Sequence, residues 1–345
     1  MYKKFDELFI DETKYGTKIK TDQYLSEGKY PIVDQGQKKI SGYTDIEDGI
    51  FKEVPAIIFG DHTRLIKYID VPFFIGADGV KIIRSRLKEI NYKYLYYALL
   101  NVSIPNTGYN RHFKWLKETK IYYPDSEKQK YIVEVLDKIS LIIEKKNKQI
   151  EQWDFLLKSL FIEMFGDISD QDKVEVSRIC KLITDGTHQP PKFEERGIPF
   201  LFVSNIVTNN ITYDTEKFIS EETYKELIKR TPIEIGDLLL STVGSYGHAA
   251  IVKFTKRFCF QRHIAYLKPK YKIVDSEYFR SAILSDNVQR QIHLGVKGIA
   301  QKTLNLSEIR KLRIPLPPMV QQQQFAKVVI EIDKSKYSSF SHLSA

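Results

Sequence analysis

The chain carries one segment twice, and this internal repeat limits the folds that it can adopt. Residues 74–101 align without a gap with residues 258–285, at an offset of 184 residues. Tyr94 falls on Tyr278 in this alignment, with aromatic and apolar positions coinciding on either side. The repeat predicts two related domains in one chain.

Each copy is followed by a second shared pattern. Residues 121–124 and 314–317 both end in proline, and each segment precedes a glutamine, Gln129 or Gln322, in an apolar-periodic run. The chain is therefore expected to be built as domain, helix, domain, helix, with an approximate internal two-fold. A partner with two related half-sites suits such a chain.

Composition places the chain among ordinary two-domain proteins. Its 345 residues are 42% hydrophobic, which is enough for two cores. The net charge of +9 falls mainly in the repeated domains, whereas the segment between them is neutral, as expected for domains that face polyanions and a helix that faces protein. Two cysteines, a charged N-terminus and the lack of a long apolar run predict a soluble cytoplasmic protein with no membrane contact.

Residues 126–164 have heptad spacing and contain neither proline nor glycine. They predict one helix of about 60 Å, punctuated by Pro124 and Gly166. A helix with a narrow apolar stripe needs a partner helix, and residues 319–333 supply a shorter one. We expect the two to pack antiparallel. The partner-binding residues predicted on both helices are Ile132, Ile139, Ile142, Trp153, Leu156, Leu157, Leu160, Phe325, Val328 and Ile332.

The predicted fold class is α+β, with two mixed α/β domains separated by long helices that form an antiparallel coiled coil. Short β-like runs broken by turn residues fill both domains, without the βαβ rhythm of a phosphate-binding fold. The expected boundaries are 1–125 for the first domain, 126–165 for the long helix, 166–318 for the second domain, and 319–345 for the shortened helix with a frayed C-terminus.

The sequence lacks the motifs of common catalytic and cofactor-binding sites. The sequence has no GxxxxGK[ST] loop, no Asn/Asp-Pro-Pro-aromatic element of adenine methyltransferases, and no GxSxG. Its seven histidines lack the spacing of a zinc site. We therefore predict a non-catalytic chain without cofactor or metal.

Four segments resemble the specificity subunits of type I restriction-modification enzymes. Residues 29–44 and 185–205 look like the openings of two target-recognition domains, the proline-then-glutamine helix entries look like the interdomain helices, and residues 325–335 are similar to the second of these helices. The resemblance covers nearly the whole chain and includes the order and repetition of these segments.

This resemblance implies a DNA-sequence-recognition subunit that reads a bipartite, gapped target in double-stranded DNA. It implies that DNA methyltransferase subunits clasp the helices and that a motor-nuclease (restriction) subunit joins them, for DNA methylation and host defence. The second helix is shorter here than is usual in the family. We therefore expect Trp153, Leu156, Leu157 and Leu160 to lack a helix partner within the chain, and to be buried by another polypeptide or another domain.

Candidate DNA-binding residues lie in polar loops that contain glycine. They are chosen for their side chains, because Asn and Gln can hydrogen-bond the edge of adenine and Arg and Lys the edge of guanine. Those of the first domain are Gln35, Lys38, Lys39, Tyr43, Arg64, Asn106, Asn110, Arg111, His112 and Lys114. Those of the second are Thr184, His188, Asn205, Ser245, Gln261, Arg262, His263, Lys297, Gln301 and Lys302. Because the two sets differ in residue type, we expect two half-sites of different sequence.

Three other functions stay open at this stage. The chain could be the recognition subunit of a type II-like methylating nuclease, a DNA methyltransferase or nuclease in its own right, or a coiled-coil structural protein. Cofactor binding would identify the enzyme, and salt-dependent DNA binding would exclude the structural protein.

Overall fold

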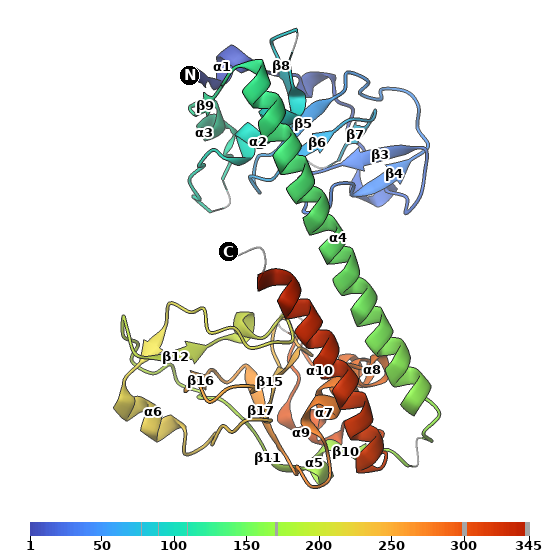
Figure 1. Cartoon of the computed structure of the whole chain (residues 1–345), viewed down its shortest axis with the longest axis vertical. Coiled ribbons are helices and arrows are strands. Elements are labelled where there is room, and N and C mark those ends of the chain that lie inside the picture. Colours follow the sequence, from blue (N-terminus) through green and yellow to red (C-terminus); the bar gives the residue numbers. More distant parts are fainter. Residues whose placement is uncertain (77, 89, 109, 170–171, 299–301, 342–345) are drawn as a thin grey trace. The chain divides into compact units, whose positions relative to one another are not determined.

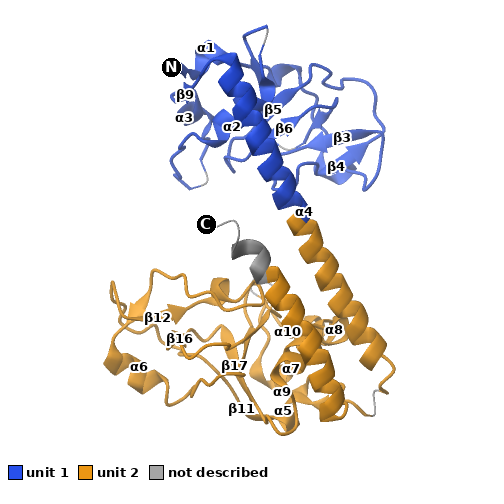
Figure 2. Cartoon of the chain, in the orientation of Figure 1, with its two compact units in different colours: residues 1–145 blue, residues 146–345 orange. Residues whose placement is uncertain are grey.

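The computed structural model describes residues 1–76, 78–88, 90–108, 110–169, 172–298 and 302–341 (Figure 1). The chain divides into two compact units, residues 1–145 (unit 1) and residues 146–345 (unit 2), coloured separately in Figure 2. The division falls inside the 40-residue helix α4 (Ser126–Phe165), so each unit contains part of it.

Unit 1 is built from short strands and helices that precede α4. They are β1 (Tyr2–Lys4), α1 (Phe5–Leu8), β2 (Phe9–Asp11), β3 (Tyr30–Val33), β4 (Gly42–Thr44), β5 (Ala56–Gly60), β6 (Ile66–Ile69), β7 (Phe74–Ile75), β8 (Val80–Ser85), α2 (Tyr92–Leu100), α3 (Phe113–Lys117) and β9 (Lys120–Tyr122).

Two small sheets form the centre of unit 1. One is antiparallel with the strand order β2-β8-β5-β6, and the other, β4-β3-β7, pairs β3 with β7 in parallel. Every residue of β5 is buried, as expected for an apolar strand with neighbours on both sides. Strand β1 pairs with β9, which places the N-terminus beside the chain that leads into α4.

Unit 2 contains the equivalent elements with additions. They are β10 (Val174–Glu175), α5 (Val176–Ile179), β11 (Cys180–Asp185), β12 (Ile198–Leu201), β13 (Phe218–Ile219), α6 (Glu221–Leu227), β14 (Leu238–Ser241), β15 (Ala249–Ile251), β16 (Cys259–Phe260), β17 (Ile264–Pro269), α7 (Ser276–Leu284), α8 (Asp286–Gly295), α9 (Leu306–Lys311), β18 (Arg313–Ile314) and α10 (Met319–Ser341).

The strand orders of unit 2 repeat those of unit 1. Its sheets are β11-β17-β14-β15, β13-β12-β16 and β10-β18, with β12 and β16 again parallel. Even single hydrogen bonds recur. The Tyr94 hydroxyl donates to the carbonyl of Tyr122 at 2.5 Å, and that of Tyr278 donates to the carbonyl of Pro315 at 2.7 Å. The predicted α+β duplication is confirmed.

The proline-then-glutamine pattern has a physical reason at both long helices. The side-chain amide of Gln129 donates to the carbonyl of Pro124 at 2.9 Å, and that of Gln322 donates to the carbonyl of Pro317 at 2.8 Å. Both glutamines are buried. Each amide therefore provides a partner for a carbonyl at the helix entry that would otherwise be buried without one.

Helices α4 and α10 pack antiparallel within unit 2, as predicted. The Phe325 ring, near the start of α10, lies 5.5 Å from Phe161 and 5.7 Å from Phe165 at the end of α4. Further along α10, Lys336 forms an ion pair with Asp154, which lies earlier in α4. These contacts give opposite chain directions for the two helices.

This pairing corrects one expectation about the apolar residues in the C-terminal half of α4. Leu157 and Leu160 are half-buried against the core of unit 2, to which Phe325 of α10 also belongs. Trp153 is half-buried, and Leu156 is 51% exposed. The expectation of a missing partner helix is wrong for Leu157 and Leu160, because the antiparallel α10 begins beside the C-terminal end of α4.

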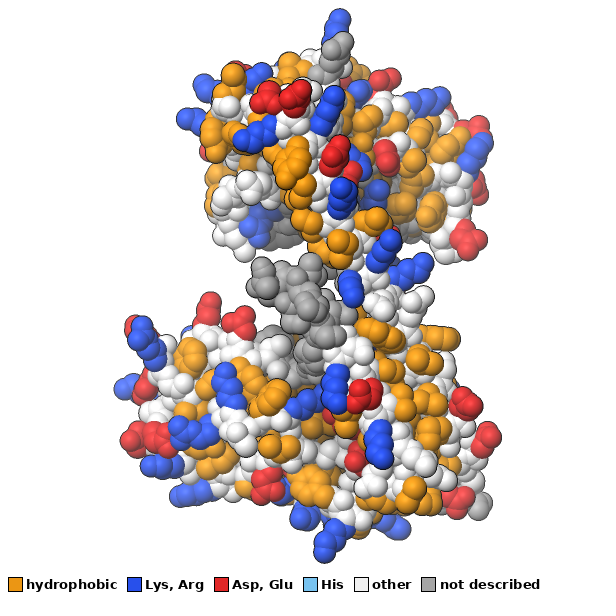
Figure 3. All heavy atoms as spheres, in the orientation of Figure 1, with side chains coloured by type: hydrophobic (Ala, Val, Ile, Leu, Met, Phe, Trp, Pro, Cys, Tyr) orange, Lys and Arg blue, Asp and Glu red, His pale blue; other side chains and the backbone are white. Residues whose placement is uncertain are grey.

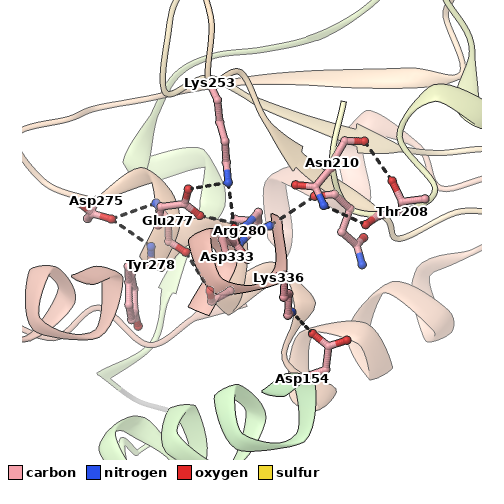
Figure 4. A network of polar contacts seen from close by, with 12 residues as sticks. Asp154, Thr208, Asn210, Lys253, Asp275, Glu277, Tyr278, Arg280, Asp333 and Lys336 are labelled. Atoms are coloured by element: carbon pink, nitrogen blue, oxygen red, sulfur yellow. Dashed lines mark hydrogen bonds and ion pairs between the residues drawn. The ribbon is translucent and has the colours of Figure 1, made fainter. Parts of the chain in front are cut away.

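A buried polar network fastens α10 to α7 (Figure 4). Asp333 of α10 accepts from Lys253 at 2.9 Å and from Arg280 of α7 at 3.2 Å. Glu277 lies 3.4 Å from Lys253 and 3.1 Å from Arg280. Burial alone would raise the pKa of Asp333, but the charges of Arg280 and Lys253 lower it below its usual value. The carboxylate thus stays ionised where α10 docks.

Hydrophobic side chains stay exposed along the first half of α4. Val135, Ile139 and Ile142, which we call the α4 stripe, are 37%, 41% and 46% exposed, and their spacing of four and three residues puts them on one face. Hydrophobic atoms, orange in Figure 3, gather along this helix. None of the described helices has the length and apolarity to cross a membrane.

Candidate nucleic-acid interface

In unit 1 the structure brings the three predicted polar clusters together at one edge of the sheets. The amide oxygen of Gln35 accepts from the main-chain N–H of His62 at 3.2 Å. Its amide nitrogen donates to the carbonyl of Asp78 at 3.0 Å, and its own carbonyl accepts from the Thr63 hydroxyl at 2.8 Å. Gln35 therefore fixes the loop after β3 to the turn after β5.

Asp61 fastens the third cluster to the same turn. Its carboxylate accepts from the N–H of Phe113 at 2.8 Å, and its carbonyl accepts from the N–H of His112 at 2.8 Å. The His112 ring nitrogen lies 3.0 Å from that carbonyl, and the side chain is fully buried. We therefore remove His112 from the DNA-binding set, because burial leaves it no surface to offer.

A buried lysine in β6 holds the loop between β3 and β4 in place. The ammonium of Lys67 in β6 donates to the carbonyls of Asp34 at 2.7 Å and Lys38 at 2.5 Å. Burial lowers its pKa, while nearby Asp34 acts in the opposite direction. The sequence reasoning missed Lys67. Alternation along β6 gave the signal, since it puts Lys67 on the same face as buried Ile69.

These bonds present a basic, polar surface, which we call loop surface 1. Its exposed members are Lys38, Lys39, Asn106, Asn110, Arg111 and Lys114, while Gln35, Tyr43 and Arg64 are half-buried. The guanidinium of Arg64 donates to the carbonyl of Ile104 at 3.3 Å, so part of this side chain holds the loop. The pKa of Asp78 is lowered mainly by a hydrogen bond from Lys18 and also by the charge of Arg111.

Unit 2 repeats the construction with different residues. The N–H of Thr242 donates to the carbonyl of His263 at 3.0 Å, as the N–H of Asp61 donates to that of Gly79 at 2.7 Å. The carbonyl of Thr242 then accepts from Leu304 at 2.8 Å, which fixes the loop before α9. In both units a residue that follows the central strand thus fastens two neighbouring loops.

The opening loop of unit 2 depends on a glycine. Thr187 donates to the carbonyl of Phe260 at 3.2 Å and accepts from the N–H of Arg262 at 3.0 Å. A Cβ atom on Gly186 would lie 2.1 Å from the Phe260 carbonyl oxygen, so only glycine allows this approach. Beyond it, His188 lies 2.9 Å from Asp185.

Loop surface 2 comprises the exposed His188, Ser245, Arg262, Lys297 and Lys302 with the half-buried Thr184, Gln261 and His263. Burial, and secondarily the charge of Arg262, lowers the pKa of His263, which favours its neutral form. Gln301 lies outside the described residues.

Asn205 belongs to the interior of unit 2. It is buried, its amide nitrogen donates to the carbonyl of Asp214 at 2.8 Å, and its amide oxygen accepts from the N–H of Phe202 at 2.9 Å. These bonds hold a turn together and use the polar atoms that DNA contact would need. We therefore remove Asn205 from the DNA-binding set.

Two loop surfaces on one repeated arrangement of strands, carrying different polar side chains, define a duplicated α+β protein with two candidate binding surfaces. Within the described ranges, no group of three or more His, Cys, Asp or Glu side chains is arranged to hold a metal ion. The family model for the type I restriction modification DNA specificity domain matches residues 2–152 and 169–338. The chain belongs to this family.

Individual relatives agree with the assignment. The chain is 24% identical over 247 residues to the type I restriction enzyme EcoBI specificity subunit of Escherichia coli, covering 63% of this chain and 52% of that one. It is 23% identical over 296 residues to the MjaVIII specificity subunit of Methanocaldococcus jannaschii, covering 75% and 69%. The chain thus spans about half the length of the EcoBI subunit.

A solved structure has the same fold. The S subunit of a type I restriction-modification system from M. genitalium superposes with a TM-score of 0.53 at 18% identity, covering 100% of this chain and 92% of that one. At this identity the likeness concerns the fold, which is the duplicated α+β arrangement described above.

Proposed function

We propose that this chain is the non-catalytic DNA-recognition subunit of a type I restriction-modification enzyme. Loop surfaces 1 and 2 each read one half-site of a bipartite target in double-stranded DNA. The helices bind DNA methyltransferase subunits, a motor-nuclease subunit completes the assembly, and the complex acts in the cytoplasm. The relatives named as specificity subunits support this proposal.

The observation that carries the proposal is the repeated construction of the two loop surfaces. The Asp61–Gly79 and Thr242–His263 hydrogen bonds keep the same loops in place in both units. The exposed side chains on these loops differ between the units. Shared main-chain bonds with different base-reading groups suit a protein that recognises two different short sequences.

Methylome mapping tests the DNA assignment. The chain is expressed with its methyltransferase, and methylated adenines are located in cellular DNA. Arg111→Ala should weaken recognition at one half-site and Lys297→Ala at the other, each by about 1–3 kcal/mol. Purified chain without the methyltransferase should transfer no methyl group from S-adenosylmethionine.

Matched controls come from the repeat itself. Lys88 and Lys272 are equivalent exposed lysines, and they follow the ends of β8 and β17 that lie away from the loop surfaces. Lys88→Ala and Lys272→Ala remove the same charge and should leave both half-sites unchanged. If Arg111→Ala and Lys297→Ala altered the same half-site, or neither altered any, the assignment of the loop surfaces would be refuted.

A further inference from the structure

An arginine outside both sets of candidate residues lies beside loop surface 2. Arg230 follows α6, and its guanidinium donates to one carboxylate oxygen of Asp185, at the end of β11. The other carboxylate oxygen of Asp185 lies 2.9 Å from Nε2 of His188, a member of loop surface 2. One carboxylate thus holds an arginine and a histidine together at the edge of this surface.

The main chain next to Arg230 is fixed on the sheet of unit 2. The following residue, Thr231, is buried. The carbonyl of Pro232 accepts from the Tyr266 hydroxyl at 2.6 Å and from the Lys268 ammonium at 3.1 Å, both in β17. Because the main chain and the guanidinium of Arg230 are both held, this side chain loses little further conformational entropy when it binds a ligand.

The carboxylate that orients Arg230 is itself part of the sheet. Asp185 pairs with Ala265 in the ladder of β11 and β17, and its side chain is 14% exposed. It directly precedes Gly186, on which the opening loop depends. The side chains of Arg230 and His188 are 53% and 54% exposed. A mostly buried carboxylate therefore holds two exposed groups that solvent, or a ligand, can reach.

The pairing with a carboxylate determines which part of DNA suits Arg230. A guanidinium has five N–H donors in one plane, so a carboxylate on one nitrogen still leaves a parallel pair of N–H groups for another ligand. The negative charge of Asp185 would repel a phosphate placed beside it. The major-groove edge of guanine presents two neutral acceptors, N7 and O6, which one arginine can bond together. A guanine edge therefore suits this arginine better than the DNA backbone does.

We propose that Arg230 reads a guanine in the half-site of loop surface 2, with Asp185 as its positioning residue. Arg230 donates to N7 and O6 of the guanine, and Asp185 keeps the plane of the guanidinium aligned with the base pair. The inference rests on the proposed function, since it takes loop surface 2 to face double-stranded DNA.

The test measures binding of the chain, in complex with its methyltransferase, to duplexes that contain the target mapped in cellular DNA. Each guanine in the half-site that Lys297→Ala alters is replaced in turn by 7-deazaguanine, which pairs normally but lacks the N7 acceptor. One replacement should weaken binding by the original chain about tenfold, as expected for one lost hydrogen bond to a charged group. With Arg230→Ala the same replacement should cause no further loss, because the partner of N7 is already absent.

Asp185→Asn tests the positioning role. This variant keeps the size of the side chain and removes its negative charge. It should bind duplexes of unrelated sequence at least as well as the original chain does, since one negative charge fewer faces the phosphates. The loss caused by 7-deazaguanine should become smaller, because a neutral amide holds a guanidinium less firmly than a carboxylate does. A merely structural role would instead weaken binding to both kinds of duplex alike.

A second arginine–carboxylate pair in unit 2 provides the matched control. Arg257 is 54% exposed and donates to both carboxylate oxygens of Glu221 at 2.8 Å. It precedes β16, whereas Gln261 and His263 of loop surface 2 follow that strand. Arg257→Ala and Glu221→Gln should therefore leave the loss caused by 7-deazaguanine as large as in the original chain.

Three results would overturn the inference and leave the proposed function standing. The half-site could contain no guanine on either strand. Arg230→Ala could keep the full loss caused by 7-deazaguanine, which would assign N7 to another residue. Arg230→Ala could also weaken binding to every duplex alike and lower the slope of log affinity against log salt by about one, which would assign a phosphate contact. If the chain and its methyltransferase methylate no specific sequence, the proposed function itself fails, and the inference fails with it.

Discussion

The two helix-entry glutamines allow a stability prediction with its control in the same chain. Gln322 bonds the carbonyls of Pro317 and Ile273, and it accepts from the N–H of Asp275. For Gln129 the structure gives the equivalent bond to Pro124. Replacement by methionine keeps the length of either side chain and removes these bonds.

The magnitude follows from the number of buried main-chain groups that lose a partner. Each such group costs about 1–3 kcal/mol. We expect Gln322→Met, which leaves three such groups without a partner, to lower the free energy of unfolding of unit 2 by about 3–9 kcal/mol. Gln129→Met, which leaves one, should lower that of unit 1 by about 1–3 kcal/mol. With a urea m-value of about 2 kcal/mol per molar, the midpoint should fall by about 1.5–4.5 M in unit 2 and by about 0.5–1.5 M in unit 1.

Tryptophan fluorescence can follow each unit separately, because the chain has two tryptophans, Trp115 in unit 1 and Trp153 in unit 2. Urea unfolding of Gln322→Met is measured with Trp115→Phe present, and that of Gln129→Met with Trp153→Phe present. Equal midpoint shifts in the two units would refute the reasoning that bonds to buried main-chain groups determine the cost.

Two further outcomes follow from buried charges. The pKa of Asp333 is lowered in the folded state by Arg280, so its stabilising effect is complete above the unfolded pKa of about 3.9 and is lost as pH falls through the lower, folded value. Melting temperature should therefore fall more steeply with acid for the original chain than for Asp333→Asn, and parallel curves from differential scanning fluorimetry would contradict this. Lys67→Met should leave the carbonyls of Asp34 and Lys38 without their donor, at a cost of about 2–6 kcal/mol. Faster hydrogen exchange in the loop between β3 and β4, measured by mass spectrometry, is the expected result, and unchanged exchange there would count against it.

The repeat made the fold predictable from the sequence. Residues 74–101 and 258–285 align because each contains β7 or β16, β8 or β17, and the helix that follows. The long helix was equally predictable from the sequence, since its apolar spacing persists for many turns. Helix α8 was not anticipated, because it lies in an insertion that only the change of alignment offset marks.

The candidate site was predictable at the level of loops but not of single side chains. The three clusters of unit 1 do meet, because two of them follow strand ends at one edge of the sheets and the third, between α2 and α3, is bonded there to Asp61. His112 and Asn205 were misassigned, since a polar residue in a loop sequence looks the same whether it bonds the main chain inside or faces solvent. That distinction depends on tertiary hydrogen bonds, such as those to Asp61 and Asp214, which no local pattern encodes.

The bonds that shape both loop surfaces have a consequence for how such a chain can change over time. Asp61–Gly79 and Thr242–His263 join main-chain atoms, so they do not depend on which side chains the loops display. Exposed positions such as Arg111 and Lys297 can therefore be replaced without moving the loops. Under the proposed function, the chain could therefore acquire a new target sequence at one half-site while the other half-site and the helices proposed to bind the methyltransferase stay unchanged.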